Sequence, residues 1–416
     1  DDIPKALQPK VAWQLGYKDR SPAGRLEAFM RDLYTHLRAI HLITRMVERR
    51  LALRPKPRHS LPSLRTLFGG GKRTETLDGF SIINGELVPA SPRVFKEQPR
   101  RLMRVFLHAQ QRSLDFHPDL TQLLRDSVSL VDDGFVHDPE MRETFLEILN
   151  RRGSVAPALR AMHEIDLLGR YIPEFGRMTC MVQHEFFHAY AADEHTLVCL
   201  EKLDQVWNAQ KPPFIHYAHI LQDIDLPYLL YLALFLHDAG KGMKSGDHVK
   251  DGTAVALRVG ERLGLTPRRL GRLQFLVEHP LLMAETSQRR DIDSPTVIRQ
   301  FAETVQDEEN LAMLTLLTFA DSLGTSNDLW NEFKNTLLQT LYRRAGRRMV
   351  SGRDYAQAEK ERLAKLKQEV REQLPEQLSE EELEAHFRHL TPRYFRAHSL
   401  QHIHIDLEQV NRFLKR

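Results

Sequence analysis

The stretch LALFLHDAGKG, residues 232–242, indicates the fold most clearly. Apolar and small residues precede His237, and a run this apolar describes a buried helix. The run is too short to span a bilayer, which needs about 20 apolar residues. The sequence therefore predicts a buried helix that delivers His237 and Asp238 at its polar end.

Helical periodicity continues on both sides of this stretch. Between Arg25 and Arg50, apolar residues recur every three or four positions, which predicts one long helix. The only clear strand signal is FSIINGELV at 80–88, where Asn84-Gly85 suits a two-residue hairpin turn. We therefore expect a mostly α protein, built as a helical bundle with flanking helical regions and one small β-hairpin.

Three regions are predicted along the chain. Residues 1–165 form a helical region with a loop at 54–79, where prolines and glycines interrupt the helical pattern. Residues 166–345 form the central bundle, and residues 346–416 form a charged helical region, since mixed charges at this density are typical of an exposed helix. The beginning, DDIPKALQPK, has neither an initiator Met nor a signal-peptide pattern, so we expect a section of a longer chain.

The composition of the 416 residues excludes several classes of protein. Lys and Arg total 59 against 56 Asp and Glu, and this net charge of +3 argues against a protein that mainly grips nucleic acid. Two cysteines cannot form a disulfide framework and favour a reducing, cytoplasmic setting. We expect neither nucleic acid nor a membrane as a partner.

Residues far from the His-Asp pair could join it around one cation. His195 begins an amphipathic helix, and Asp321 follows an almost wholly apolar helical run. A buried lone carboxylate costs several kcal/mol unless it is paired or bound to metal, so Asp321 needs a partner. Imidazoles and carboxylates suit Mn, Mg, Fe or Zn. His248 and His279 lie between these points and suggest a second cation nearby, although each alone is more often structural.

The order of these residues resembles that of the HD-domain metal-dependent phosphohydrolases. Longer stretches resemble one family, the bifunctional PII uridylyltransferase/uridylyl-removing enzymes of bacterial nitrogen control. The stretches that carry the resemblance are LGRYIPEFGRMTCMVQHEFFHAYAADEHTL (168–197), LFLHDAGKGMKSGDH (234–248), EHPLLMAETSQRRDI (278–292) and FADSLGTSNDLWNEFK (319–334). The resemblance extends from about Leu26 to Tyr394 and implies an HD domain within 166–345.

The resemblance also implies roles for individual residues. The family's metal ligands correspond to His195, His237, Asp238 and Asp321, with His248 and His279 as a second-metal pair. Lys241, Arg289 and Arg290 are expected to contact a nucleotide phosphate, because cationic side chains neutralise a phosphoryl transition state. Together with His237 and Asp238, Lys241 is expected to be catalytic. The implied cofactor is one or two divalent ions, Mn or Mg before Fe or Zn.

The implied reaction is hydrolysis of a tyrosyl-UMP phosphodiester on PII. A metal ion would activate the attacking water, and UMP would be released. The implied partners are a PII-type signal protein and its uridylylated form. The family's transferase core has a Gly-Gly-Ser turn followed by Asp-x-Asp, whereas this chain has Gly69-Gly70-Gly71 with neither feature after it. The family's C-terminal ACT modules are missing as well.

Two alternative functions stay open at this point. The segment from His184-Glu185 to His188 is a literal H-E-x-x-H, the helix signature of zinc proteases, although only Glu201 is available as a third ligand. A second alternative is a catalytically silent scaffold that binds a nucleotide or PII without turnover. The presence of the full ligand set weighs against the scaffold.

Overall fold

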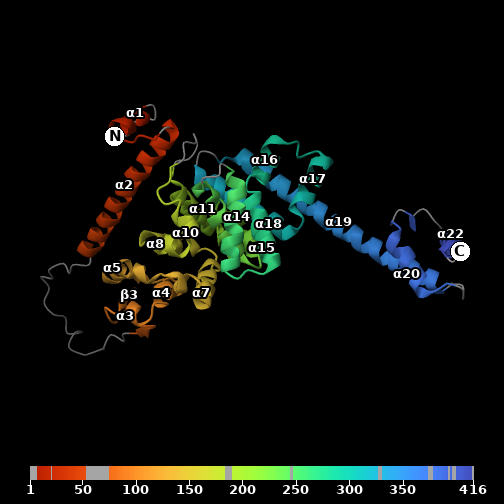
Figure 1. Ribbon diagram of the computed structural model, residues 1–416, viewed down its shortest axis with the longest axis horizontal. Coiled ribbons are helices and arrows are strands. Elements are labelled where there is room, and N and C mark those ends of the chain that lie inside the picture. Colours follow the sequence, from red (N-terminus) through yellow and green to blue (C-terminus); the bar gives the residue numbers. More distant parts are fainter. Residues whose placement is uncertain are drawn as a thin grey trace. The chain divides into compact units, whose positions relative to one another are not determined.

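The computed structural model describes residues 7–19, 21–52, 75–182, 190–243, 247–326, 330–372, 378–391, 394–395 and 400–414. Helices dominate this part of the chain, which confirms the mostly α fold class (Figure 1). Contacts divide the chain into two compact units. The first joins Asp1–Val297 to Asp307–Tyr342, and the second joins Ile298–Gln306 to Arg343–Arg416. The predicted boundaries at 165 and 345 stay predictions.

The long helix expected from Arg25 to Arg50 is confirmed. It is α2, Pro22–Ala52, and a short helix α1, Gln8–Gln14, precedes it. Ala12 of α1 packs in a small core with Leu26, Phe29 and Met30 of α2. The apolar spacing of α2 thus buries only the first part of the helix.

The predicted hairpin is confirmed within a larger sheet. Strands β2, Phe80–Ile83, and β3, Glu86–Pro89, pair antiparallel around Asn84 and Gly85, whose φ values are 54° and 85°. Strand β1, Glu75–Leu77, pairs antiparallel with β2, and β4, Asp115–Phe116, pairs parallel with β3.

Two expectations about this region need correction. The expectation of one hairpin was incomplete, because a strand of two or three residues is too short to show an alternating pattern. The predicted loop at 54–79 was wrong at its end, where residues 75–79 form β1 and the turn into β2. The part of that loop up to residue 74 lies outside the described residues.

Short helices connect the sheet to the rest of the first unit. They are α3 Val94–Glu97, α4 Arg101–Arg112, α5 Pro118–Ser127, η2 Val128–Leu130, α6 Asp133–Val136, α7 Pro139–Leu149, α8 Val155–Glu164, α9 Leu167–Tyr171 and α10 Pro173–Gly176. Asp132 and Asp138 accept hydrogen bonds from backbone N–H groups at the starts of α6 and α7. Such side-chain caps explain why helices this short have defined beginnings.

Longer helices form the bundle that holds the predicted site. They are α11 Ala192–Val206, α12 Ile215–Gln222, α13 Pro227–Leu236, η3 Ala239–Gly242, α14 His248–Arg262, α15 Pro267–Glu278, α16 Leu282–Arg289 and α18 Glu308–Thr325. Helix α11 packs against α18 and α13, and α15 packs against α13, α14 and α18. Figure 1 shows α11, α14, α15 and α18 gathered in one bundle.

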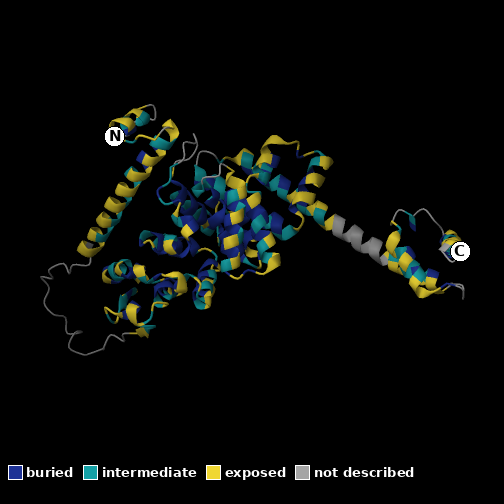
Figure 2. Ribbon diagram, in the orientation of Figure 1, coloured by how far each residue is buried: buried dark blue, intermediate teal, exposed yellow. Residues whose placement is uncertain are grey.

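The core of this bundle surrounds α13. Every residue of α13 is buried, which confirms the buried helix expected from LALFLHDAGKG. Figure 2 shows the buried residues concentrated in this bundle, while α2 is mostly exposed. Within the described residues, no single helix meets the length and apolarity needed to cross a membrane, and one pair, α12 with α13 and η3, meets them only across a bend of 119°.

The remaining helices carry the charged C-terminal part. Helix α17, Pro295–Val305, and helix α19, Glu332–Glu372, each contribute to both units, whereas α20, Glu380–His389, and α22, Leu400–Leu414, belong to the second. The end of α19 packs with α20 and α22 around Val370, Leu383 and Ile403, which are fully buried. The charged sequence thus includes a small core of its own.

A candidate metal centre

Three helices bring two histidines and an aspartate together. His237 caps the C-terminal end of α13, His195 lies in the first turn of α11, and Asp321 lies near the end of α18. One ligand atom from each lies within 4.8 Å of the other two. His195 Nε2 is 3.1 Å and His237 Nε2 is 3.5 Å from Asp321 Oδ1. The packing of the three helices therefore brings three potential metal ligands close enough to bind one ion.

Asp238 lies beside these residues, and its carboxylate contacts both histidines and a lysine. Its Oδ2 atom is 3.7 Å from His195 Nε2 and 3.5 Å from His237 Nε2. Lys241, one turn later in η3, donates a hydrogen bond from Nζ to the same oxygen at 2.9 Å. Lys241 is thus bonded to a candidate ligand, and its predicted contact with phosphate stays a prediction.

The orientation of His237 is fixed by its own helix. Its Nδ1–H donates to the carbonyl oxygen of Leu234 at 2.7 Å, so Nε2 faces the two carboxylates. Metal-binding histidines commonly use one nitrogen in this way, which sets the tautomer of the ring. The apolar helix α13 therefore supplies both the position and the direction of this imidazole.

Burial and nearby opposite charges shift the pKa values of His237 and Asp321 in opposite directions. Burial opposes the charged form of His237, but the Asp238 and Asp321 carboxylates outweigh it and raise its pKa to about 9. Burial likewise favours neutral Asp321, yet hydrogen bonds from His195 and His237 hold the pKa of Asp321 well below its usual range. The site thus keeps its carboxylates ionised, the state in which they bind cations.

The donor set fits a divalent cation. Two imidazole nitrogens and one or two carboxylate oxygens match the mixed N/O ligands of Mn, Mg, Fe or Zn. The side chains of His195 and His237 are 2% and 3% exposed, whereas that of Asp321 is 20% exposed. The imidazoles therefore lie on the inner side of the site, and the carboxylates lie on the side that solvent partly reaches.

The other predicted ligands are not part of this group. His248 begins α14 and is exposed, and the ring of His279, at the end of α15, packs against that of Phe275 with centroids 5.1 Å apart. Among the described residues, neither histidine belongs to a group of three possible ligands within 4.8 Å. Their assignment to a second ion stays a prediction.

The predicted phosphate contacts lie at the end of α16. Arg289 is its last residue and pairs at 3.9 Å with Glu285 of the same helix, while Arg290 follows as the C-cap; both are exposed. Exposed arginines have their guanidinium groups available to a substrate at little desolvation cost.

The H-E-x-x-H segment that contains Glu185 lies outside the described residues.

Cys199 also borders the group of candidate ligands, although no sequence pattern assigned it to the site. The Cys199 Sγ atom lies 3.5 Å from His195 Nε2 and 4.0 Å from Asp321 Oδ1. Burial, and then the charges of Asp321 and Asp238, raise the pKa of this thiol well above its usual range. Among the described residues, the group of ligand atoms that lie within 4.8 Å of one another does not include Cys199 Sγ, so Cys199 borders the site as an apolar neighbour. Its spacing, one helical turn from His195, was the available signal.

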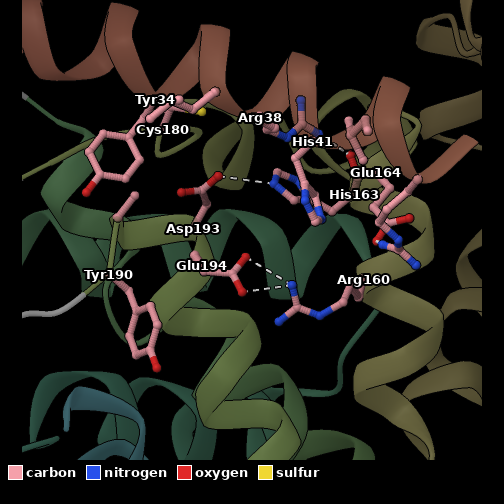
Figure 3. A pocket seen from close by; sticks show the side chains of 14 residues that line it. Tyr34, Arg38, His41, Arg160, His163, Glu164, Cys180, Tyr190, Asp193 and Glu194 are labelled. Atoms are coloured by element: carbon pink, nitrogen blue, oxygen red, sulfur yellow. Dashed lines mark hydrogen bonds and ion pairs between the residues drawn. The ribbon is translucent and has the colours of Figure 1, made fainter. Parts of the chain in front are cut away.

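A second missed feature is a buried pair on the opposite face of α11. Asp193 Oδ2 lies 3.1 Å from His163 Nε2, and within the described structure Asp193 Oδ1 is buried without a hydrogen-bond partner. The pair borders a cavity of about 400 Å³ between α2, α8 and the start of α11. Figure 3 shows the pair beside the ion pair of Arg160 and Glu194. Residues two apart on a helix face different sides, so this cavity is separate from the His195 site.

The chain is similar to proteins of one known family. Residues 80–171 match the family model described as the Uridylyltransferase GlnD third domain. Three similar proteins are each named bifunctional uridylyltransferase/uridylyl-removing enzyme. The chain is 35% identical over 344 residues to that of Cereibacter sphaeroides, 33% over 347 residues to that of Ruegeria pomeroyi, and 34% over 407 residues to that of Nitrosococcus oceani.

These alignments cover most of this chain but less than half of each relative. They include 82%, 83% and 94% of the chain, and 36%, 38% and 43% of the three relatives in the same order. The chain thus spans about two fifths of the length of these curated relatives.

Proposed function

Because the chain is homologous to the bifunctional uridylyltransferase/uridylyl-removing enzymes, we propose that it is a metal-dependent phosphodiester hydrolase. Its substrate in this proposal is the uridylylated PII nitrogen-regulatory protein, and its product is UMP. This reaction corresponds to the uridylyl-removing activity for which the relatives are named.

One observation carries the proposal. His195, His237 and Asp321 are separated by up to 126 residues in the sequence, yet their ligand atoms lie within 4.8 Å of one another. Burying ionisable groups together is costly, and coordination of a cation is one of the few arrangements that compensates it. The Uridylyltransferase GlnD family model matches residues 80–171 and does not include these side chains, whereas the alignments with the three relatives cover 82%, 83% and 94% of the chain.

The residues divide into those that hold the ion and those that face the substrate. His195, His237, Asp321 and Asp238 would hold a divalent cation, with Mn or Mg as the first candidates. Such a cation lowers the pKa of a water molecule and polarises a phosphoryl oxygen. The partly exposed Asp321 would face the phosphodiester, while the buried imidazoles would hold the ion from the inner side.

The positive side chains have separate parts in this proposal. Lys241 neutralises Asp238 through its 2.9 Å contact and stands at the rim of the site, where it would attract a phosphate oxygen. Arg289 and Arg290 would contact the nucleotide phosphate from the end of α16. His248 and His279 would serve a second ion.

Hydrolysis can be tested in two steps. The chain is assayed with Mn²⁺ on bis(p-nitrophenyl) phosphate and then on uridylylated PII, with UMP release as the readout. Wild type should turn over both substrates, and Asp321→Asn and Asp238→Ala should each lose at least about 100-fold in rate, since each removes a charge at the ion.

A matched control separates site effects from general effects of charge removal. Asp126 is exposed on α5, so Asp126→Asn should retain the wild-type rate. Wild-type chain that binds Mn²⁺ but releases no product from either substrate would contradict the hydrolase proposal and favour the silent scaffold.

A further inference from the structure

Helices α11 and α18 approach closely one turn beyond the candidate ligands. At Gly324 of α18, a Cβ atom would fall well inside the contact distance of Cys199 Sγ and would lie 3.2 Å from both Cα and N of Cys199. Real Cβ atoms rarely have such contacts with a backbone. Only glycine at position 324 therefore allows the two helices to lie at this separation.

This contact lies directly beside the site. Cys199 follows His195 by four residues, and Gly324 follows Asp321 by three, so each lies on the same face of its helix as the ligand. Cys199 Sγ is also 3.7 Å from His195 Nδ1 and 3.5 Å from His195 Nε2. The sulfur thus fills the space between the imidazole of one helix and the backbone of the other.

We propose that Cys199 and Gly324 are positioning residues, which set the helix separation at which His195 and Asp321 bind one ion together. This inference rests on the proposed function, because it assigns the two residues to the metal site. Their role is steric: the glycine permits close approach, and the sulfur limits it.

Metal–ligand distances vary little, so the separation of α11 and α18 affects how well the ion is bound. Ligand bonds to a given divalent ion vary by about 0.2 Å, so the ligand atoms must be held to a few tenths of an ångström. An added methyl group at position 324 has to displace α11, because the neighbouring atoms belong partly to the Cys199 backbone. The displacement would separate His195 from Asp321, which now lie 3.1 Å apart.

The test measures Mn²⁺ affinity by isothermal titration calorimetry in the full chain. Gly324→Ala should weaken Mn²⁺ binding at least about tenfold. Gly271→Ala is the matched control, because a Cβ at this α15 glycine meets no atom within 4 Å, and its affinity should equal that of wild type. Equal affinities for Gly324→Ala and wild type would overturn the proposal.

Two further variants distinguish positioning from other roles. Cys199→Ala should weaken Mn²⁺ binding about threefold, because the spacer between the helices is lost while every ligand remains. Affinity equal to that of wild type would show that the sulfur does not set the separation, and a loss as large as that of His195→Ala would make it a ligand; either result would overturn the proposal. In Cys199→Ala/Gly324→Ala the sulfur no longer meets the new methyl group, so part of the lost affinity should return. A double variant that binds Mn²⁺ no more tightly than Gly324→Ala would also overturn the proposal. If Gly324→Ala does not fold, a double variant that does not fold either would overturn it as well.

The outcomes for the two proposals can be told apart. Wild-type chain that binds no Mn²⁺ and hydrolyses nothing would reject the proposed function itself. Wild-type binding with hydrolysis, combined with unchanged affinity in Gly324→Ala, would reject only the positioning role.

Discussion

At the scale of single residues, charge compensation defines the candidate centre. Asp321 remains ionised because two imidazoles donate to it, and Asp238 remains ionised because His237, Lys241 and His195 outweigh its burial and lower its pKa. A divalent cation can replace the extra proton of His237 without leaving the carboxylates unbalanced. This property separates the site from an ordinary buried salt bridge, in which the partner is a permanent side-chain charge.

A carboxyl group elsewhere on α11 gives a pH prediction. Asp204 accepts hydrogen bonds from the Tyr231 hydroxyl and the Ala156 N–H, each at 2.7 Å, yet its burial dominates and raises its pKa from 3.8 to about 6. Between about pH 4 and pH 6 the folded state therefore holds more protons than the unfolded state. The free energy of unfolding should fall by on the order of 3 kcal/mol as pH rises through this window.

Denaturant unfolding at several pH values measures this effect. The comparison is with Asp204→Asn, which cannot titrate, so the difference in free energy of unfolding between wild type and variant should change between pH 4 and pH 6 and stay constant from pH 6.5 to 8. A difference that does not vary with pH would show that Asp204 titrates normally in the folded protein.

At the scale of elements, a buried arginine joins the helices around the site. Arg272 of α15 donates from Nε to Asn310 Oδ1 at 2.8 Å and pairs with Asp307 and Glu309. These partners form the N-terminal end of α18, the helix that carries Asp321. Arg272→Met should lower the free energy of unfolding by about 1–3 kcal/mol, because it removes the donor to the buried Asn310 amide oxygen and the cation beside Asp307 and Glu309, whose partial exposure weakens the ion pairs.

The same substitution at an exposed arginine is the control. Arg268 lies one turn earlier on α15 and is exposed, so Arg268→Met should change the free energy of unfolding by less than about 0.5 kcal/mol. Chemical denaturation measures both variants. Similar losses at both positions would mean that the contacts of Arg272 carry no special weight.

Local patterns account for the elements that the sequence predicted correctly. The long helix α2 follows from three- and four-residue spacing, and the hairpin follows from Asn84-Gly85, since each depends on neighbours in the chain. Strand β4 has only two residues and pairs parallel with β3, so no periodicity reveals it. Tertiary contacts, which local patterns do not encode, decide such short strands.

Only part of the candidate site could be predicted from the sequence. The apolar run before His237 predicts a buried helix with polar residues at its end, and α13 has this form. The meeting of His195 with Asp321 depends on the packing of α11 on α18, which no single stretch contains. It was expected because a buried carboxylate needs a partner and because the family resemblance implies the ligand set. The Cys199–Gly324 contact escaped prediction because it appears only when both helices are in place.

At the scale of the whole molecule, the ion should stabilise the unit that contains the bundle. An ion that binds only the folded state adds about 2.7 kcal/mol at a concentration of 100 times Kd. We therefore expect Mn²⁺ to raise the thermal midpoint of wild type by several degrees in differential scanning calorimetry.

The variants should separate this effect from general salt effects. Asp126→Asn should show the same rise as wild type, and Asp321→Asn should show almost none. An equal rise in Asp321→Asn would place the stabilising ion elsewhere in the chain.

The most direct measurement is anomalous X-ray scattering from crystals soaked in Mn²⁺. We expect one strong peak about 2.0–2.3 Å from His195 Nε2, His237 Nε2 and a carboxylate oxygen of Asp321. No peak between these three side chains, or ordered Mn²⁺ only at other positions, would contradict it.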